Sequence, residues 1–199
     1  MRIHPAVRAV LAISLSIGAA AAQTATARIV TAANAFLSTL DDKQRKTVSF
    51  AFDDEEQRQR WSNFPTGFVP RGGISLKQMS PSQSSAAMAL VSAALSERGF
   101  EKVRQIMQGD EILKTSEGNG PPGRGGGSRG GRAGGPPGGR GDGGQMFGED
   151  LYYISILGTP SEKNQWMLQF GGHHLALNIT IAGERGILTP TLTGAQPAL

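Results

Sequence analysis

Two adjacent histidines, His173 and His174, are the residues of this chain best suited to do chemistry. The imidazole group titrates near neutral pH, so it can accept or donate a proton in catalysis, and it is also a common metal ligand. Asn178 follows shortly after them and adds a hydrogen-bonding amide. His173, His174 and Asn178 therefore form a candidate polar site, in which a histidine would serve as a general base or a metal ligand.

The two histidines lead into the clearest strand pattern of the chain. Apolar residues at odd positions alternate with small or polar residues at even positions from residue 175 to 182. The odd set is expected to face the core, and the even set to face water, a groove or a second layer. His173 would then lie on the odd, apolar side and His174 on the even side with Asn178. The two rings would point apart and could not easily share one metal ion, so we predict no metal site and no cofactor.

The histidine pair also has a structural interpretation. His173 could be a hydrogen-bonded residue at the edge of the core, and His174 a surface residue. A catalytic role would require a carboxylate partner such as Glu149, Asp150 or Glu184. The sequence leaves both interpretations open and identifies no catalytic residue.

The two tryptophans, Trp61 and Trp166, are candidate residues for stacking against a ligand. Trp61 lies in an irregular connection together with Phe64 and Phe68. Large aromatic residues in a loop usually anchor the loop to the core, and a platform for a sugar or a peptide is the alternative. The acidic run at residues 53–56 is interpreted as a helix start, with a cation site as the alternative.

The first 22 residues have the features of a secretory signal peptide. Arg2 and Arg8 form a positively charged start, a short apolar run follows at residues 9–19, and small residues up to Ala22 offer a cleavage site. The apolar run is shorter than the roughly 20 residues that a membrane span needs. We therefore expect a secreted or periplasmic protein without a transmembrane segment after signal removal.

Charge and cysteine content limit the possible partners and stabilising bonds. The net charge of +4 comprises +2 from residues 1–22, +3 from residues 118–144 and −1 from the remainder. The remaining part is thus nearly neutral, and no nucleic-acid partner is expected. The chain has no cysteine, which excludes disulfides and thiolate metal sites.

Residues 23–117 are predicted to be helical. Apolar residues recur at helical spacing from near Thr26, a second short helix follows Asp41, and the pair Ser80 and Gln83 forms a capping box before a third. This third helix is expected to end at Gly99 and to form a helical hairpin with the helix that follows.

Residues 118–144 are rich in Gly, Arg and Pro and almost lack apolar residues, so they are predicted to be a flexible, disordered insertion of low complexity. Residues 145–199 contain successive strand patterns separated by short turns, which indicates an antiparallel β-meander. The predicted fold class is α+β, with the N-terminal helices, including the helical hairpin, packed on the C-terminal meander as one domain.

Several segments resemble a known family when they are taken in order. They include AFLSTLDDKQR, ALVSAALSERGFEKVRQIM, DLYYISILGTPS and WMLQFGGHHLALNITI. These segments are similar to the domain of unknown function 3500 family, a group of uncharacterised exported bacterial proteins. The resemblance implies no activity, because the family has none established. Its members are longer, so this chain is expected to be a truncated member.

Three functions remain open on the sequence. The first is an exported binding or accessory protein with an unknown partner. The second is an exported hydrolase that uses the region of His173 and His174. The third is an inactive, truncated remnant. The sequence does not decide whether the protein is an enzyme.

Overall fold

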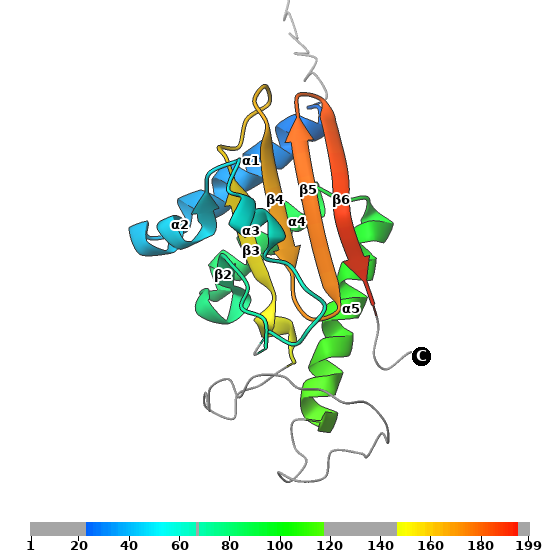
Figure 1. Cartoon of the computed structure of the whole chain (residues 1–199). Helices are drawn as coiled ribbons and strands as arrows, with labels where there is room; N and C mark the ends of the chain where they lie inside the picture. The colour runs from blue at the N-terminus through cyan, green and yellow to red at the C-terminus, as the bar shows by residue number, and fades with distance from the viewer. Residues whose placement is uncertain (1–22, 67, 118–146, 195–199) are drawn as a thin grey trace, which may run out of the picture.

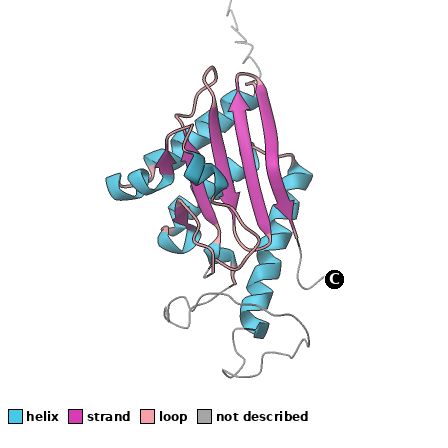
Figure 2. Ribbon diagram, viewed as in Figure 1, coloured by secondary structure: helices cyan, strands magenta, loops and turns pink. Residues whose placement is uncertain are grey.

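The computed structural model describes residues 23–66, 68–117 and 147–194. In this part of the chain a single sheet carries long helices on one face and a short helix with an extended loop on the other (Figures 1 and 2). Helices dominate the N-terminal half and strands the C-terminal half. The α+β class predicted from the sequence is confirmed.

Four helices make up most of the helical part of the fold. They are α1 (Ala25–Ser38), α2 (Asp42–Val48), α4 (Pro81–Ala93) and α5 (Glu97–Glu117). The side chains of Thr24, Asp41 and Ser80 cap the first three by accepting a backbone N–H bond. The capping box predicted at Ser80 and Gln83 is present.

The position of the helical hairpin's turn was predicted incorrectly. Helix α4 ends at Ala93, and Gly99 lies within the first turn of α5. The reason is a cap, because the hydroxyl of Ser96 accepts a hydrogen bond from the amide of Gly99 at 3.1 Å. The chain therefore reverses three residues before Gly99, and this glycine is not needed to end a helix.

The C-terminal strands form the predicted antiparallel meander. They are β3 (Tyr153–Leu157), β4 (Trp166–Gly171), β5 (Leu175–Ala182) and β6 (Arg185–Thr193), paired in that order. Two short strands of the N-terminal half, β1 (Ser49–Phe50) and β2 (Ile74–Ser75), also pair with β3. The sequence did not predict them, because two residues are too few for a periodic pattern.

The main core lies between the sheet and the helices α1, α4 and α5. The odd-numbered apolar residues of β5 are buried there, as predicted, against residues such as Phe36 of α1, Leu90 of α4 and Ile106 of α5. Trp166 and Phe170 of β4 belong to the same cluster. The helices thereby fix the position of the β4–β5 turn, where the histidines lie.

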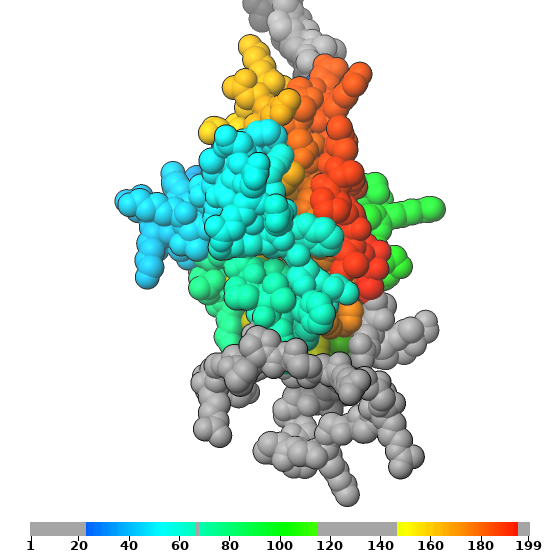
Figure 3. Space-filling view, viewed as in Figure 1, coloured from blue at the N-terminus to red at the C-terminus, as the bar shows by residue number. Residues whose placement is uncertain are grey.

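The opposite face of the sheet is covered by a second layer. Helix α3 (Glu55–Gln59) and the loop that follows it cross this face in front of β3, β4 and β5 (Figures 1 and 3). Ala176 and Asn178 are consequently buried on the even side of β5. The even positions of this strand were expected to face water, a groove or a second layer. Ala176 and Asn178 face the second layer.

No helix within the described residues is both long and apolar enough to cross a membrane. The predicted cleavage site at Ala22 and the predicted insertion at residues 118–144 lie outside the described residues.

Candidate functional site

Three side chains from distant parts of the chain meet at the β4–β5 turn. Asp110 of α5 is almost fully buried, and one of its carboxylate oxygens pairs with Nδ1 of His174. Its other oxygen accepts a hydrogen bond from the hydroxyl of Tyr152 at 2.6 Å. Since a carboxylate can only accept here, Nδ1 of His174 carries the hydrogen. The Nε2 atom is left as the basic nitrogen, and it has no hydrogen bond to another described residue.

Tyr152 is a neutral support for this arrangement. Burial, and then the charge of Asp110 and the hydrogen bond to it, raise the pKa of Tyr152 far above its ordinary value. The phenol therefore stays protonated and continues to donate to Asp110. Because Tyr152 is fully buried, its hydroxyl holds the carboxylate oxygen that His174 does not contact.

The two histidine rings pack against each other with their planes tilted by 59°. Their centroids lie 4.0 Å apart, and the ring of Phe147 packs 5.2 Å from that of His173. Burial is the main cause that lowers the pKa of His173, and the neighbouring His174 and Arg71 act in the same direction. The prediction that the rings point apart is wrong, because both residues lie in the bend before β5 begins at Leu175.

Arg71 holds the loop of the second layer against the histidine turn. Its guanidinium donates to the carbonyl oxygens of Ser62 and Phe64, each at 2.6 Å, and to that of Gly172 at 3.2 Å. It also donates to the carbonyl oxygen of Val69. Arg71 therefore closes the loop on itself and connects it to the residue before His173.

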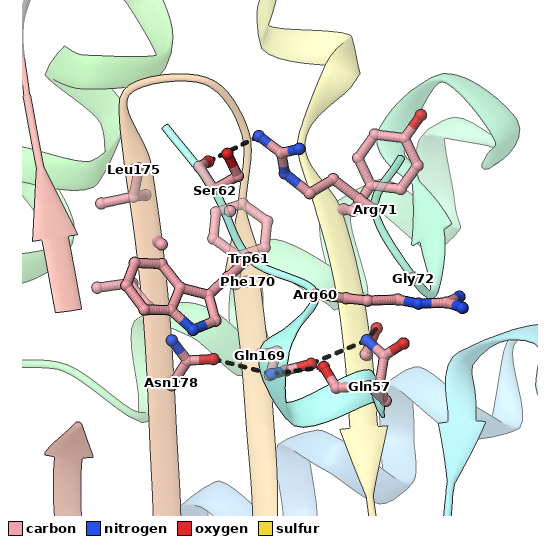
Figure 4. Close-up of a pocket in the computed structure, with 15 residues that line it drawn as sticks. Gln57, Arg60, Trp61, Ser62, Arg71, Gly72, Gln169, Phe170, Leu175 and Asn178 are labelled. Atoms are coloured by element: carbon pink, nitrogen blue, oxygen red, sulfur yellow. Dashed lines mark hydrogen bonds between the residues drawn. The ribbon is translucent and has the colours of Figure 1, made fainter. Parts of the chain in front are cut away.

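A separate pocket lies between this loop and the sheet (Figure 4). Its floor is a chain of amides from helix α3 and the neighbouring strands β4 and β5. The Nε2 atom of Gln169 donates to Oδ1 of Asn178 at 2.9 Å, and Oε1 of Gln169 accepts from Nε2 of Gln57 at 2.9 Å. Asn178 continues the chain by donating to the carbonyl of Pro190 at 2.8 Å. Trp61 lies in the wall of the same pocket.

One atom of this amide chain has no partner. The Oε1 atom of Gln57 is buried and accepts no hydrogen bond, whereas Nε2 of the same side chain donates to both Ser155 and Gln169. The side chain of Asp54 caps the start of α3 by accepting a hydrogen bond from the amide of Gln57. The side chain of Gln57 is buried against the sheet. This oxygen is enclosed by the protein beside Gly72, and an unpaired buried acceptor of this kind is costly to the fold.

Comparison with known proteins places the chain in a family. The family model described as "Protein of unknown function (DUF3500)" matches residues 22–199. The chain belongs to this family. No curated protein and no solved structure shows a significant match to this DUF3500 chain. The resemblance noted in the sequence is therefore confirmed.

The predicted polar site of this DUF3500 chain is divided by the sheet. His173 and His174 lie together at the β4–β5 turn, and His174 faces Asp110 on the helical side. Asn178 lies on the opposite face, in the amide chain. The prediction that His174 shares a face with Asn178 is wrong, because the even-odd pattern of β5 does not extend back into the bend.

The two tryptophans predicted to stack against a ligand lie in different environments. Trp61 is partly buried and lines the pocket, whereas Trp166 is fully buried in the core and donates its indole N–H to the carbonyl of Ser161 at 3.1 Å. Trp166 therefore presents no face to a ligand. Phe64 and Phe68 are 61% and 69% exposed and do not anchor the loop to the core.

The sequence reasoning missed the carboxylate partner of His174. Glu149 and Glu184 are exposed, and Asp150 lies near Lys114. Asp110 could have been found from its spacing, because it continues the apolar face of α5 that contains Val103, Ile106 and Met107. A charged residue on a buried face needs a partner. No cluster of three potential metal ligands occurs among the described residues.

Proposed function

We propose that the chain is exported and acts as a ligand-binding protein in the periplasm or outside the cell. Export is supported by Arg2 and Arg8 ahead of the apolar run and by the small residues that end at Ala22. Cell fractionation of a C-terminally tagged chain, with N-terminal sequencing of the exported form, tests this. A new N-terminus at Gln23 is expected, and a tagged protein that stays in the cytoplasm with Met1 intact contradicts export.

Binding is supported by the pocket beneath the loop of the second layer. The decisive observation is that the amides of Gln169 and Asn178, held in fixed positions on neighbouring strands, line the same pocket as Trp61. Trp61 adds a large aromatic surface to the same pocket. Pockets that bind small molecules typically combine such an apolar surface with a few fixed polar groups.

A thermal-shift screen with sugars, peptides and metal ions tests the binding function. At least one ligand class should raise the melting temperature, and Trp61→Ala should abolish the shift. Ile187→Ala is the matched control, because Ile187 is an exposed apolar residue of β6 that does not line the pocket. If no ligand class shifts the melting temperature of the parent chain, the binding function fails.

Hydrolysis at His174 is the second candidate function, and the contact with Asp110 favours it. The carboxylate keeps the hydrogen on Nδ1, so Nε2 can accept a proton from a water molecule or a hydroxyl group. This is the orientation that a buried carboxylate gives to a catalytic histidine in hydrolases. The side chain of His174 is 14% exposed. It lines neither the amide pocket nor a second pocket beside α4 and α5, so binding remains the first proposal.

Turnover assays on ester, peptide and glycoside substrates test this second function. His174→Gln should lower the rate by at least about a hundredfold if His174 is the general base. Asp110→Asn should also lower it, because the amide no longer enforces the same tautomer. A parent chain that turns over a substrate and a His174→Gln variant with the same rate would together exclude the role.

A further inference from the structure

The loop that follows α3 is joined to the sheet beside the two histidines. Its described residues are 60–66 and 68–73. The guanidinium of Arg71 donates to the carbonyl oxygens of Ser62 (Figure 4) and Phe64, each at 2.6 Å, and so holds the loop in a closed shape. The same guanidinium donates to the carbonyl oxygen of Gly172, in the β4–β5 turn, at 3.2 Å. A single side chain thus shapes the loop and joins it to the turn.

The ring of His173 lies at the same junction. It makes a hydrogen bond to the backbone of Phe64 in the loop. It also packs against the rings of Phe147 and His174, at centroid distances of 5.2 and 4.0 Å. Its Nδ1 atom is buried and has no hydrogen-bond partner among the described residues. A ring enclosed in this way, with one nitrogen unpaired, is suited to the neutral form.

A proton on His173 makes this position unfavourable. Both ring nitrogens of an imidazolium ion carry hydrogen, so the enclosed Nδ1 becomes a donor without an acceptor. Arg71 of the loop and His174 of the same turn both disfavour the new charge. Asp110 of α5 and the backbone of Phe64 favour it, but both carboxylate oxygens of Asp110 are already engaged in hydrogen bonds. The balance of these effects, led by burial, lowers the pKa of His173 below its ordinary value.

We propose that protonation of His173 releases the loop from the β4–β5 turn, so that the protein opens on this side in acid. Release lets the ring reach water and separates its charge from the guanidinium of Arg71. Histidine is the side chain whose charge ordinarily changes near neutral pH, which makes it the usual sensor in switches of this kind. The opening is a property of the loop itself and does not require a ligand.

Opening would enlarge the pocket beneath the loop. In the closed structure this cavity is about 20 Å³, which is room for one group of the size of water. Trp61, Ser62 and Arg71 line it from the loop, whereas Gln169 and Asn178 line it from the sheet. A larger ligand therefore needs the loop to move, and it should bind more tightly at acidic pH than at neutral pH. This consequence rests on the binding function proposed above.

Acrylamide quenching of tryptophan fluorescence in the full chain, at pH 7.5 and pH 5.5, measures the opening. Trp61 lies in the loop, whereas Trp166 is fully buried in the core, so a change reports on the loop. The quenching constant of the parent should rise at least about twofold at pH 5.5, with an unchanged far-UV circular dichroism spectrum. His173→Gln should keep the low constant at both pH values, and Lys163→Gln, an exposed control, should follow the parent.

Arg71→Ala provides a second test that does not depend on the histidine variant. Without the bond to Gly172 the loop should be open at both pH values, so the quenching constant should be high throughout. Equal quenching of the parent at the two pH values overturns the proposal. A His173→Gln protein that still shows the rise also overturns it, because the proton then acts at another group. An Arg71→Ala protein with the low constant of the parent at pH 7.5 contradicts the junction on which the proposal depends.

The outcomes also separate the release of the loop from the binding function. If the loop opens at pH 5.5 and no ligand class shifts the melting temperature at either pH, the binding function fails and the release of the loop stands. If a ligand binds while the loop stays closed at both pH values, the release of the loop fails and the binding function stands.

Discussion

Asp110 and His174 are 64 residues apart in the chain and are paired through Oδ1 and Nδ1. The pair joins helix α5 to the turn between β4 and β5. Tyr152 closes the arrangement by donating to Oδ2 of the same carboxylate. Helix and sheet are thus connected by a buried polar contact at one end, in addition to the apolar core.

Replacing Asp110 by Ala should destabilise the fold by about 2–4 kcal/mol. The change leaves the hydroxyl of Tyr152 without its acceptor and His174 without its partner. Urea denaturation followed by circular dichroism measures the loss. Glu101→Ala is the control, because Glu101 is exposed on the same helix and should change stability by less than about 0.5 kcal/mol. Equal stabilities of the two variants would contradict a structural role for Asp110.

Tyr152→Phe should cost about 1–3 kcal/mol. The ring still fills its place in the core, but Oδ2 of Asp110 loses a hydrogen bond of 2.6 Å in a buried position. Denaturation of the single variants and of the double variant with Asp110→Ala forms a cycle. In the double variant the cost of removing the hydroxyl should nearly disappear, since its acceptor is gone. Fully additive losses would show that the two groups act independently.

Asn178→Ala should destabilise the sheet by about 1–3 kcal/mol, because the amide of Gln169 and the carbonyl of Pro190 both lose a partner. Thr180→Ala on the same face of β5 is the control and should have the smaller effect, because Thr180 is only partly buried. The comparison is again made by urea denaturation. A larger loss in Thr180→Ala would argue against the importance of the amide chain.

The helices and the long strands could be predicted because their apolar residues recur with the right period. The capping box at Ser80 and the alternation in β5 are local signals, and both predicted elements are present. Gly99 was misjudged because a glycine suggests a helix end only when no side chain caps the next helix, and Ser96 does so here. Strands β1 and β2 form only through pairing with β3, which no local pattern encodes.

The candidate sites depend on contacts between residues far apart in sequence. His174 was identified from its type, but its partner Asp110 is determined by how α5 crosses the sheet. Gln57 and Gln169 looked like ordinary polar residues, and only the packing of α3 on the sheet joins them. Side-chain chemistry can be read from the sequence, whereas such pairings require the assembled fold.

The stability of the protein should fall as the pH is lowered through about 6.5, in part through His173. Burial, and then the neighbouring His174, lower the pKa of His173 in the folded state. The unfolded chain has the ordinary value and binds the proton first, so the free energy of unfolding decreases with acidification and this contribution levels off above neutral pH. His173→Gln should therefore show a smaller decrease in unfolding free energy between pH 7 and pH 5. Lys163→Gln, an exposed control, should follow the parent, and parallel curves for all three proteins would refute the assignment to His173.

Gly172→Ala should destabilise the fold by about 1–3 kcal/mol, because the site is too tightly packed for a methyl group. A Cβ atom at Gly172 would lie 2.8 Å from Cε2 and 2.9 Å from Cδ2 of Tyr152. The ring cannot move away easily, since it is fully buried and its hydroxyl is held by Asp110. Gly186→Ala is the matched control, because a Cβ there would have no atom within 4 Å, and its stability should stay within about 0.5 kcal/mol of the parent. Thermal unfolding of both variants measures the difference, and a Gly172→Ala protein as stable as the control would mean that Tyr152 is not fixed in place.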